Sequence, residues 1–144
     1  MEQRLSLVTL GVTDLDRATA FYQAMGWQPS ASPEGVVFFQ AGGMVLALWD
    51  RAALAVDSGT EALDKGGWGG VTLAQNVRSA ADVDELLAAA QEAGAQVVRE
   101  PNDTFWGGYA GCFLDPDGHA WEIAYNPYWA VTDDGRTLVG DGRG

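Results

Sequence analysis

The feature that most constrains the fold of this chain is an internal repeat. Two segments, VFFQAGGMVLALW from Val37 and CFLDPDGHAWEIA from Cys112, align without a gap and pair Gly43 with Gly118. A repeated unit of this size is typical of two supersecondary modules that stack and share a core. The chain has 144 residues, which suits one compact domain built from two such modules.

Each half also carries the pattern of one helix among four strands. The first helix is expected to begin at Thr13 or Asp14 and to end at Gly26, and the second to begin at Ser79 or Asp82 and to end at Gly94. The expected strands are 4–12, a short one near Trp27, 36–40, 44–49, 70–77, 95–99, 109–114 and 119–125. The sequence therefore predicts an α+β fold with the order β-α-β-β-β twice over.

These patterns also predict the domain boundaries. We expect one domain over residues 1–128, with module one at about 4–56 and module two at about 68–128. Residues 50–67 are rich in turn formers and acidic residues and are expected to link the modules, and 129–144 form a C-terminal tail.

Composition excludes several classes of partner. The net charge is −12, from 20 acidic and 8 basic residues, so we expect no binding to nucleic acid or to an anionic membrane. An acidic field steers cationic ligands, although it also serves solubility alone. No apolar run approaches the roughly 20 residues of a membrane helix. The single cysteine, Cys112, excludes an internal disulfide, and with the lack of a signal-peptide pattern it predicts a cytoplasmic protein.

Two stretches carry a family resemblance. VTLGVTDLDRATAFYQAMGW near the start and GCFLDPDGHAWEIAYNP near the end resemble the vicinal oxygen chelate superfamily, from about Leu5 to Pro127. That superfamily includes glyoxalases, extradiol dioxygenases, fosfomycin-resistance enzymes and bleomycin-binding proteins. The resemblance implies paired βαβββ modules whose mixed sheets curl into a cup, usually completed by dimerisation, so a homodimer is expected.

The resemblance also implies where a metal would be held. Enzymes of the superfamily use four side chains from four strands, and the matching positions here are Leu7, Ala47, Gly70 and Glu122. One carboxylate cannot hold zinc, iron or manganese against water, because such sites need three or four donors. We therefore expect no metal and no cofactor. Gln75 and His119 stay open as donors of a non-standard site, although strand alternation places His119 opposite Glu122.

The expected cup is apolar and aromatic, as small-molecule sites usually are. A four-residue turn after Leu114 would pair Gly111 with Glu122, so Tyr109 and Phe113 would face the same side as Glu122. Trp106 is expected in a lid or wall against which a planar ligand stacks, or in a packed loop. The candidate ligand contacts are Leu7, Thr9, Phe38, Ala47, Trp49, Gly70, Thr72, Trp106, Tyr109, Phe113, Glu122 and Asn126.

Three functions follow from this cup. The favoured one is a metal-free protein that binds a small aromatic or cationic molecule and sequesters an antibiotic or related metabolite. The second is an enzyme, a lyase, isomerase or dioxygenase-like catalyst, that uses Glu122 as an acid or base or holds a metal through shifted ligands. The third is an accessory protein whose own side chains fill the cup. A lone carboxylate without oxyanion donors favours binding over catalysis.

Overall fold

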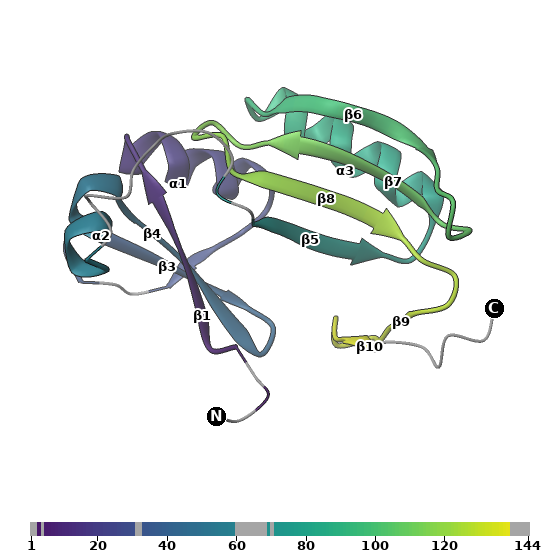
Figure 1. Ribbon diagram of the computed structural model, residues 1–144, viewed down its shortest axis with the longest axis horizontal. Coiled ribbons are helices and arrows are strands. Elements are labelled where there is room, and N and C mark those ends of the chain that lie inside the picture. Colours follow the sequence, from purple (N-terminus) through teal and green to yellow (C-terminus); the bar gives the residue numbers. More distant parts are fainter. Residues whose placement is uncertain (1–2, 4, 31–32, 60–68, 70, 139–144) are drawn as a thin grey trace. The chain divides into compact units, whose positions relative to one another are not determined.

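The computed structural model shows two compact units, Met1–Gly70 and Val71–Gly144. The residues it describes are 3, 5–30, 33–59, 69 and 71–138. Each unit holds a four-stranded mixed sheet with one long helix on one of its faces (Figure 1). The predicted α+β fold with two βαβββ modules is confirmed.

The first unit contains β1 (Leu7–Val12), α1 (Leu15–Ala24), β2 (Pro29–Ser30), β3 (Val36–Ala41) and β4 (Met44–Asp50). Its sheet has the order β1-β4-β3-β2, with β1 parallel to β4 and the other pairs antiparallel. Residues that alternate along the strands, including Phe39 and Leu48, are buried with Phe21 and Tyr22 of α1. This apolar layer between sheet and helix is the core of the unit.

The second unit contains β5 (Thr72–Val77), α3 (Ala80–Glu92), β6 (Gln96–Asp103), β7 (Tyr109–Leu114) and β8 (Ala120–Tyr125). Its sheet has the order β5-β8-β7-β6, which repeats the topology of the first unit. The helix α3 lies along one face of this sheet (Figure 1) and buries Val83, Leu87 and Ala90. The other face is left for the candidate site.

The helix ends follow the predicted signals. Asp14 caps α1 and Ser79 caps α3, and each side-chain oxygen accepts a backbone N–H of the first turn, at 2.9 and 3.2 Å. Both helices are followed by a glycine with positive φ, 92° at Gly26 and 110° at Gly94. This conformation is open to glycine at little cost, which explains why each helix stops there.

Three local expectations need correction. Part of the segment expected as a linker forms a short helix, α2 (Arg51–Asp57), whose first turn donates to the Asp50 carboxylate at 2.8 Å. Alanine and leucine favour that helix despite the acidic turn formers around it. The strand expected to end at Arg99 continues to Asp103. The expected tail contains a hairpin of β9 (Ala130–Val131) and β10 (Thr137–Leu138).

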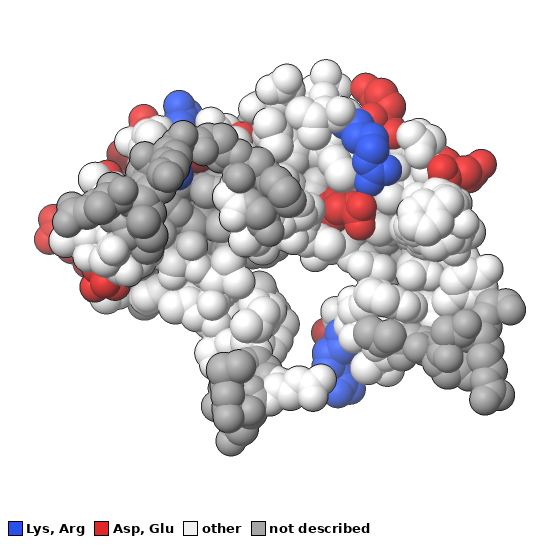
Figure 2. Space-filling model, viewed as in Figure 1, with Lys and Arg blue, Asp and Glu red and all other residues white. Residues whose placement is uncertain are grey.

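The surface of the described residues has two relevant properties. No helix among them is long and apolar enough to cross a membrane. Figure 2 shows the described arginine side chains of each unit as small separate spots. Phosphate backbones are bound by clustered lysine and arginine, and the expected lack of nucleic-acid binding stays a prediction.

The turn of the β9–β10 hairpin depends on one carboxylate. Asp134 accepts a hydrogen bond from the Thr132 hydroxyl and a second from Arg136 Nε at 3.0 Å. These two hydrogen bonds lower the pKa of Asp134 below its ordinary value of 3.8, and the bond from the Thr132 hydroxyl has the larger effect. Arg78 Nη2 donates to the Thr132 carbonyl at 2.6 Å and ties the hairpin to the end of β5.

We expect the hairpin to loosen in acid. A lowered folded-state pKa means that Asp134 stabilises the hairpin above the unfolded pKa, and that this contribution is lost as the pH falls through the folded one. An NMR titration of the Asp134 carboxyl should show a midpoint below 3.8. Asp134→Asn should abolish this acid transition, while the matched charge change Asp133→Asn should leave it in place. A midpoint at or above the ordinary value would contradict the prediction.

Candidate ligand-binding site

The second unit contains a pocket of about 650 Å³. Its lining comes from β5, the β6–β7 loop, β8 and the turn after β8. The lining residues are Asn76, Trp106, Glu122, Ala124, Asn126, Tyr128 and Trp129. Three of these were predicted as ligand contacts from the sequence, namely Trp106, Glu122 and Asn126.

Strand alternation along β8 aims Glu122 into this pocket. Its neighbours Trp121 and Ile123 are 7% and 2% exposed and belong to the core. Glu122 and Ala124 therefore point to the opposite face of the sheet, away from α3. Asn76 on β5 lies directly beside Ala124 in the strand register and shares this face.

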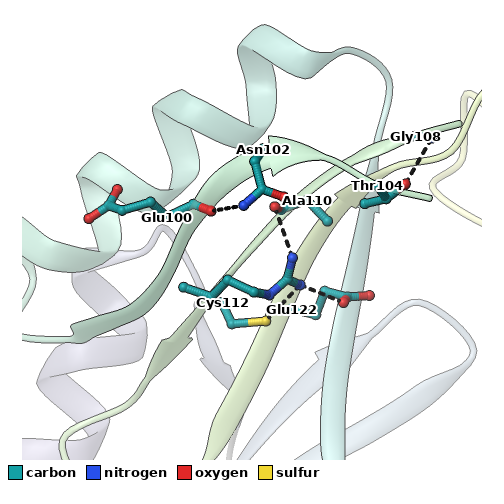
Figure 3. Close-up of polar contacts among 8 residues, drawn as sticks. Glu100, Asn102, Thr104, Gly108, Ala110, Cys112 and Glu122 are labelled. Atoms are coloured by element: carbon teal, nitrogen blue, oxygen red, sulfur yellow. Dashed lines mark hydrogen bonds and ion pairs between the residues drawn. The ribbon is translucent and has the colours of Figure 1, made fainter. Parts of the chain in front are cut away.

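Glu122 is paired with an arginine that the sequence analysis did not single out. Arg99 Nη2 lies 3.0 Å from Glu122 Oε2, and the same guanidinium donates to the Ala110 carbonyl at 3.3 Å and to Cys112 Sγ at 3.1 Å (Figure 3). The Arg99 and Glu122 side chains are 39% and 35% exposed. A pair this exposed contributes no more than about 1 kcal/mol to stability, so its main effect is to place a fixed positive charge beside the carboxylate.

The course of β6 explains how Arg99 reaches the site. The register between β6 and β7 shifts on both sides of Arg99, which lies opposite Cys112. Pro101 has no backbone N–H to give to the ladder, and such irregularities are tolerated on an edge strand. Two signals in the sequence could have pointed to Arg99: it is a charged residue directly after the apolar pair Val97-Val98, and Glu122 needed a partner.

The register of β7 against β8 corrects the predicted position of two candidates. Cys112 lies opposite Glu122, and Phe113 lies opposite Trp121. This pairing is one residue away from the expected one, because the connection spans residues 115–119 rather than four residues. A one-residue shift moves every side chain to the other face. Tyr109 and Phe113 therefore do not share the face of Glu122.

Contacts on the α3 side confirm this correction. A Cβ atom built on Gly111 would lie 2.3 Å from Leu87 Cδ1, so this strand packs directly beneath α3. The Tyr109 hydroxyl donates to Asp84 Oδ1 of α3 at 2.9 Å. The pKa of Tyr109 is raised above its ordinary value of 10.0, mainly by this hydrogen bond and secondly by burial of the hydroxyl. Both features belong to the helix–sheet interface and not to the pocket.

A tight loop between β6 and β7 provides the first aromatic wall. Thr104 N donates to the Gly108 carbonyl at 2.9 Å, and Gly108 N donates to the Thr104 hydroxyl at 3.0 Å (Figure 3). The Trp106 ring folds back over Gly108, where an added Cβ would lie 1.8 Å from the ring. The loop is thus held by its own hydrogen bonds, with Trp106 on the pocket.

The Asn-Pro pair of the C-terminal motif makes the second wall. Asn126 Oδ1 accepts from Tyr128 N at 3.0 Å, and the Asn126 carbonyl accepts from Trp129 N at 3.2 Å. This turn brings Tyr128 and Trp129 to the pocket. The Tyr128 ring also contacts the first loop, because a Cβ on Gly107 would lie 3.1 Å from its hydroxyl. The sequence analysis did not place Tyr128 and Trp129 in the site. The turn-forming pair Asn126-Pro127 was the signal that could have predicted their position.

The other predicted residues lie as follows. On the first sheet, the strand register places one set of candidates on a single face, namely Leu7, Thr9, Phe38, Ala47 and Trp49. Thr72 lies beside Ala120 on the Glu122 face but does not line the pocket. Gly70 lies outside the described residues. The ligand contacts of all these residues stay predictions.

Comparison of the sequence with known families gives a match to the Glyoxalase/Bleomycin resistance protein/Dioxygenase superfamily over residues 4–123. The chain belongs to this superfamily. A search of curated proteins found no match. Membership of this superfamily accounts for the two βαβββ modules.

Several solved structures resemble this chain over most of its length. A glyoxalase-related enzyme from Fulvimarina pelagi is 35% identical, with a TM-score of 0.86 over 96% of this chain and 99% of that one. A hypothetical protein from S. aureus is 28% identical, with a TM-score of 0.75 over 88% and 95%. A lactoylglutathione lyase from Agrobacterium tumefaciens, 24% identical with a TM-score of 0.65 over 87% and 95%, shares the fold.

The described residues do not fit the four-donor metal site that the superfamily implies. Leu7 and Ala47 carry no donor atom, and Glu122 Oε2 already accepts from Arg99. No group of three or more His, Cys, Asp or Glu residues in the described ranges could hold an ion. Gln75 pairs with Ile123 and therefore lies on the face of the sheet opposite to Glu122. The Arg99 guanidinium beside the Glu122 carboxylate also repels a metal cation.

Proposed function

We propose that this protein binds a small aromatic molecule in the pocket of its second unit and does so without a metal. One observation carries the proposal: three aromatic side chains and two amides surround a carboxylate whose charge is balanced by an arginine. A volume of about 650 Å³ suits a ligand of drug size. Sequestration of an antibiotic or related metabolite is the role that we propose for this binding.

The aromatic walls determine the ligand class more strongly than charge does. Trp106 lies on the β6–β7 loop, with Tyr128 and Trp129 on the turn after β8, and all three rings border the pocket. Flat ligands gain from stacking on such rings. Arg99 offsets the Glu122 charge nearby, so attraction of a cation rests mainly on the net charge of −12.

Calorimetric titration with a panel of aromatic natural products tests this function. We expect binding, and we expect Trp106→Leu to weaken it about tenfold or more, which corresponds to about 1.4 kcal/mol. Phe105→Leu is the matched control, because the adjacent Phe105 side chain is fully exposed, at 102%, and does not border the pocket. Absence of binding across the panel at high micromolar concentration, or equal losses in both variants, would contradict the proposal.

An enzyme of the superfamily is the second candidate, and one comparison favours it. The structure from Fulvimarina pelagi that shares 35% identity is described as an enzyme. Glu122 keeps one oxygen outside its ion pair with Arg99 and could accept a proton from a bound carbon acid. Loss of turnover at saturating ligand in Glu122→Gln would favour this second function.

The open pocket argues against the third function, an accessory protein whose own side chains fill the cup. The homodimer stays a prediction for light scattering to test.

A further inference from the structure

The orientation of the Asn126 side chain is fixed by the turn that it makes. Its Oδ1 accepts the backbone N–H of Tyr128 at 3.0 Å. The amide nitrogen is therefore the group left for a ligand, and an amide nitrogen can only donate. Within the described residues, this nitrogen has no hydrogen-bond partner of its own.

Glu122 offers the opposite group. Arg99 Nη2 donates to Glu122 Oε2 at 3.0 Å. A carboxylate oxygen accepts and does not donate, so Oε1, which has no partner in the described part of the chain, presents an acceptor. Arg99 thus fixes the orientation of the carboxylate, as Tyr128 fixes that of the Asn126 amide.

These two groups lie at opposite ends of the pocket floor. Glu122, Ala124 and Asn126 follow one another at alternate positions and all line the pocket. At about 3.3 Å per residue, the Glu122 and Asn126 backbones are roughly 13 Å apart. Ala124 lies between them and has no polar side-chain atom, so the floor is apolar. Asn76 beside it can donate or accept and sets no direction.

From this arrangement we infer that the pocket selects the direction of its ligand. The ligand is an elongated planar aromatic molecule with a hydrogen-bond donor at the Glu122 end and a carbonyl-type acceptor at the Asn126 end. Its ring body lies over Ala124 between Trp106 and the rings of Tyr128 and Trp129. This inference rests on the proposed binding function and adds the chemical class and orientation of the ligand.

Three rod-shaped probes test the inference by calorimetry. The probe 4-acetyl-4′-aminobiphenyl carries both groups, 4-aminobiphenyl lacks the acceptor, and 4-acetylbiphenyl lacks the donor. Since the ring body is the same, differences in Kd report the two hydrogen bonds. We expect the first probe to bind about tenfold more tightly than either of the others.

Two isosteric variants assign each bond to its residue. Asn126→Asp keeps the oxygen that accepts from Tyr128 N and replaces the donor by an acceptor. Glu122→Gln keeps an oxygen for Arg99 and replaces the free acceptor by a donor. Asn126→Asp should remove the advantage of the acetyl group and leave that of the amine. Glu122→Gln should do the reverse, a crossed pattern that a general structural defect does not produce.

The outcomes separate this inference from the function on which it rests. If all three probes bind with the same Kd, or if both variants weaken every probe alike, the direction is wrong while binding of aromatic molecules stands. If the unmodified protein binds no probe, both the direction and the proposed function are wrong.

Discussion

Replacing Gly108 with alanine is expected to remove the first aromatic wall and to lower the free energy of unfolding by about 2 kcal/mol or more. The new Cβ would lie 1.8 Å from Trp106 Cζ3 and 2.4 Å from the Tyr125 carbonyl oxygen. Trp106 can turn out of the way, but the Tyr125 carbonyl belongs to the backbone of β8. Both the ring and the Thr104–Gly108 hydrogen bonds must therefore shift. Urea denaturation measures the stability, and near-ultraviolet circular dichroism reports the Trp106 environment.

Gly43→Ala is the matched control for this substitution. A Cβ on Gly43 would meet no heavy atom within 4 Å, and its φ lies outside the left-handed region. The change should alter stability by no more than about 0.5 kcal/mol. The binding consequence is separate: Gly108→Ala should weaken an aromatic ligand at least as much as Trp106→Leu does. If Gly108→Ala has the stability and affinity of the unmodified protein within error, the β6–β7 loop is looser than its hydrogen bonds imply.

Most of the fold was predictable because its signals are local. The caps at Asp14 and Ser79, the closing glycines and the strand patterns each depend on a few neighbouring residues. The repeat then supplied the topology, since two copies of one unit fold by the same rules. The helix at Arg51–Asp57 was missed because acidic and turn-forming residues surround it in the sequence.

The candidate site was harder to predict because it depends on pairing between strands. Arg99 and Glu122 lie on strands separated by β7, and only the register brings their side chains within 3.0 Å. Tyr109 and Phe113 were placed on the wrong face by one residue of register. The residues of the DPDG turn do not determine how many residues connect β7 to β8. That number decides which face of the sheet each β7 side chain occupies.

Asp115 controls that length, so Asp115→Ala is expected to cost about 3 kcal/mol of stability. The residue is 5% exposed, and its Oδ1 accepts from Asp117 N at 3.0 Å and from His119 N at 2.9 Å. Hydrogen bonds to a charged acceptor contribute about 1.5–3 kcal/mol each, and alanine leaves both amides without that acceptor. Chemical denaturation measures the loss, and amide exchange along β7 and β8 should report a weakened ladder.

Asp115→Asn separates the geometry of the turn from the charge of its acceptor. Asparagine keeps an oxygen for the Asp117 and His119 amides, and its own tendency to form such turns is high. We expect it to cost about 1 kcal/mol, less than half the alanine effect, with the exchange pattern of β7 and β8 retained. Because Cys112 and Glu122 are paired by this turn, Asp115→Ala should also disturb the Arg99–Glu122 contact and weaken ligand binding. Equal losses in the two variants would show that charge, rather than the acceptor geometry, sets the register.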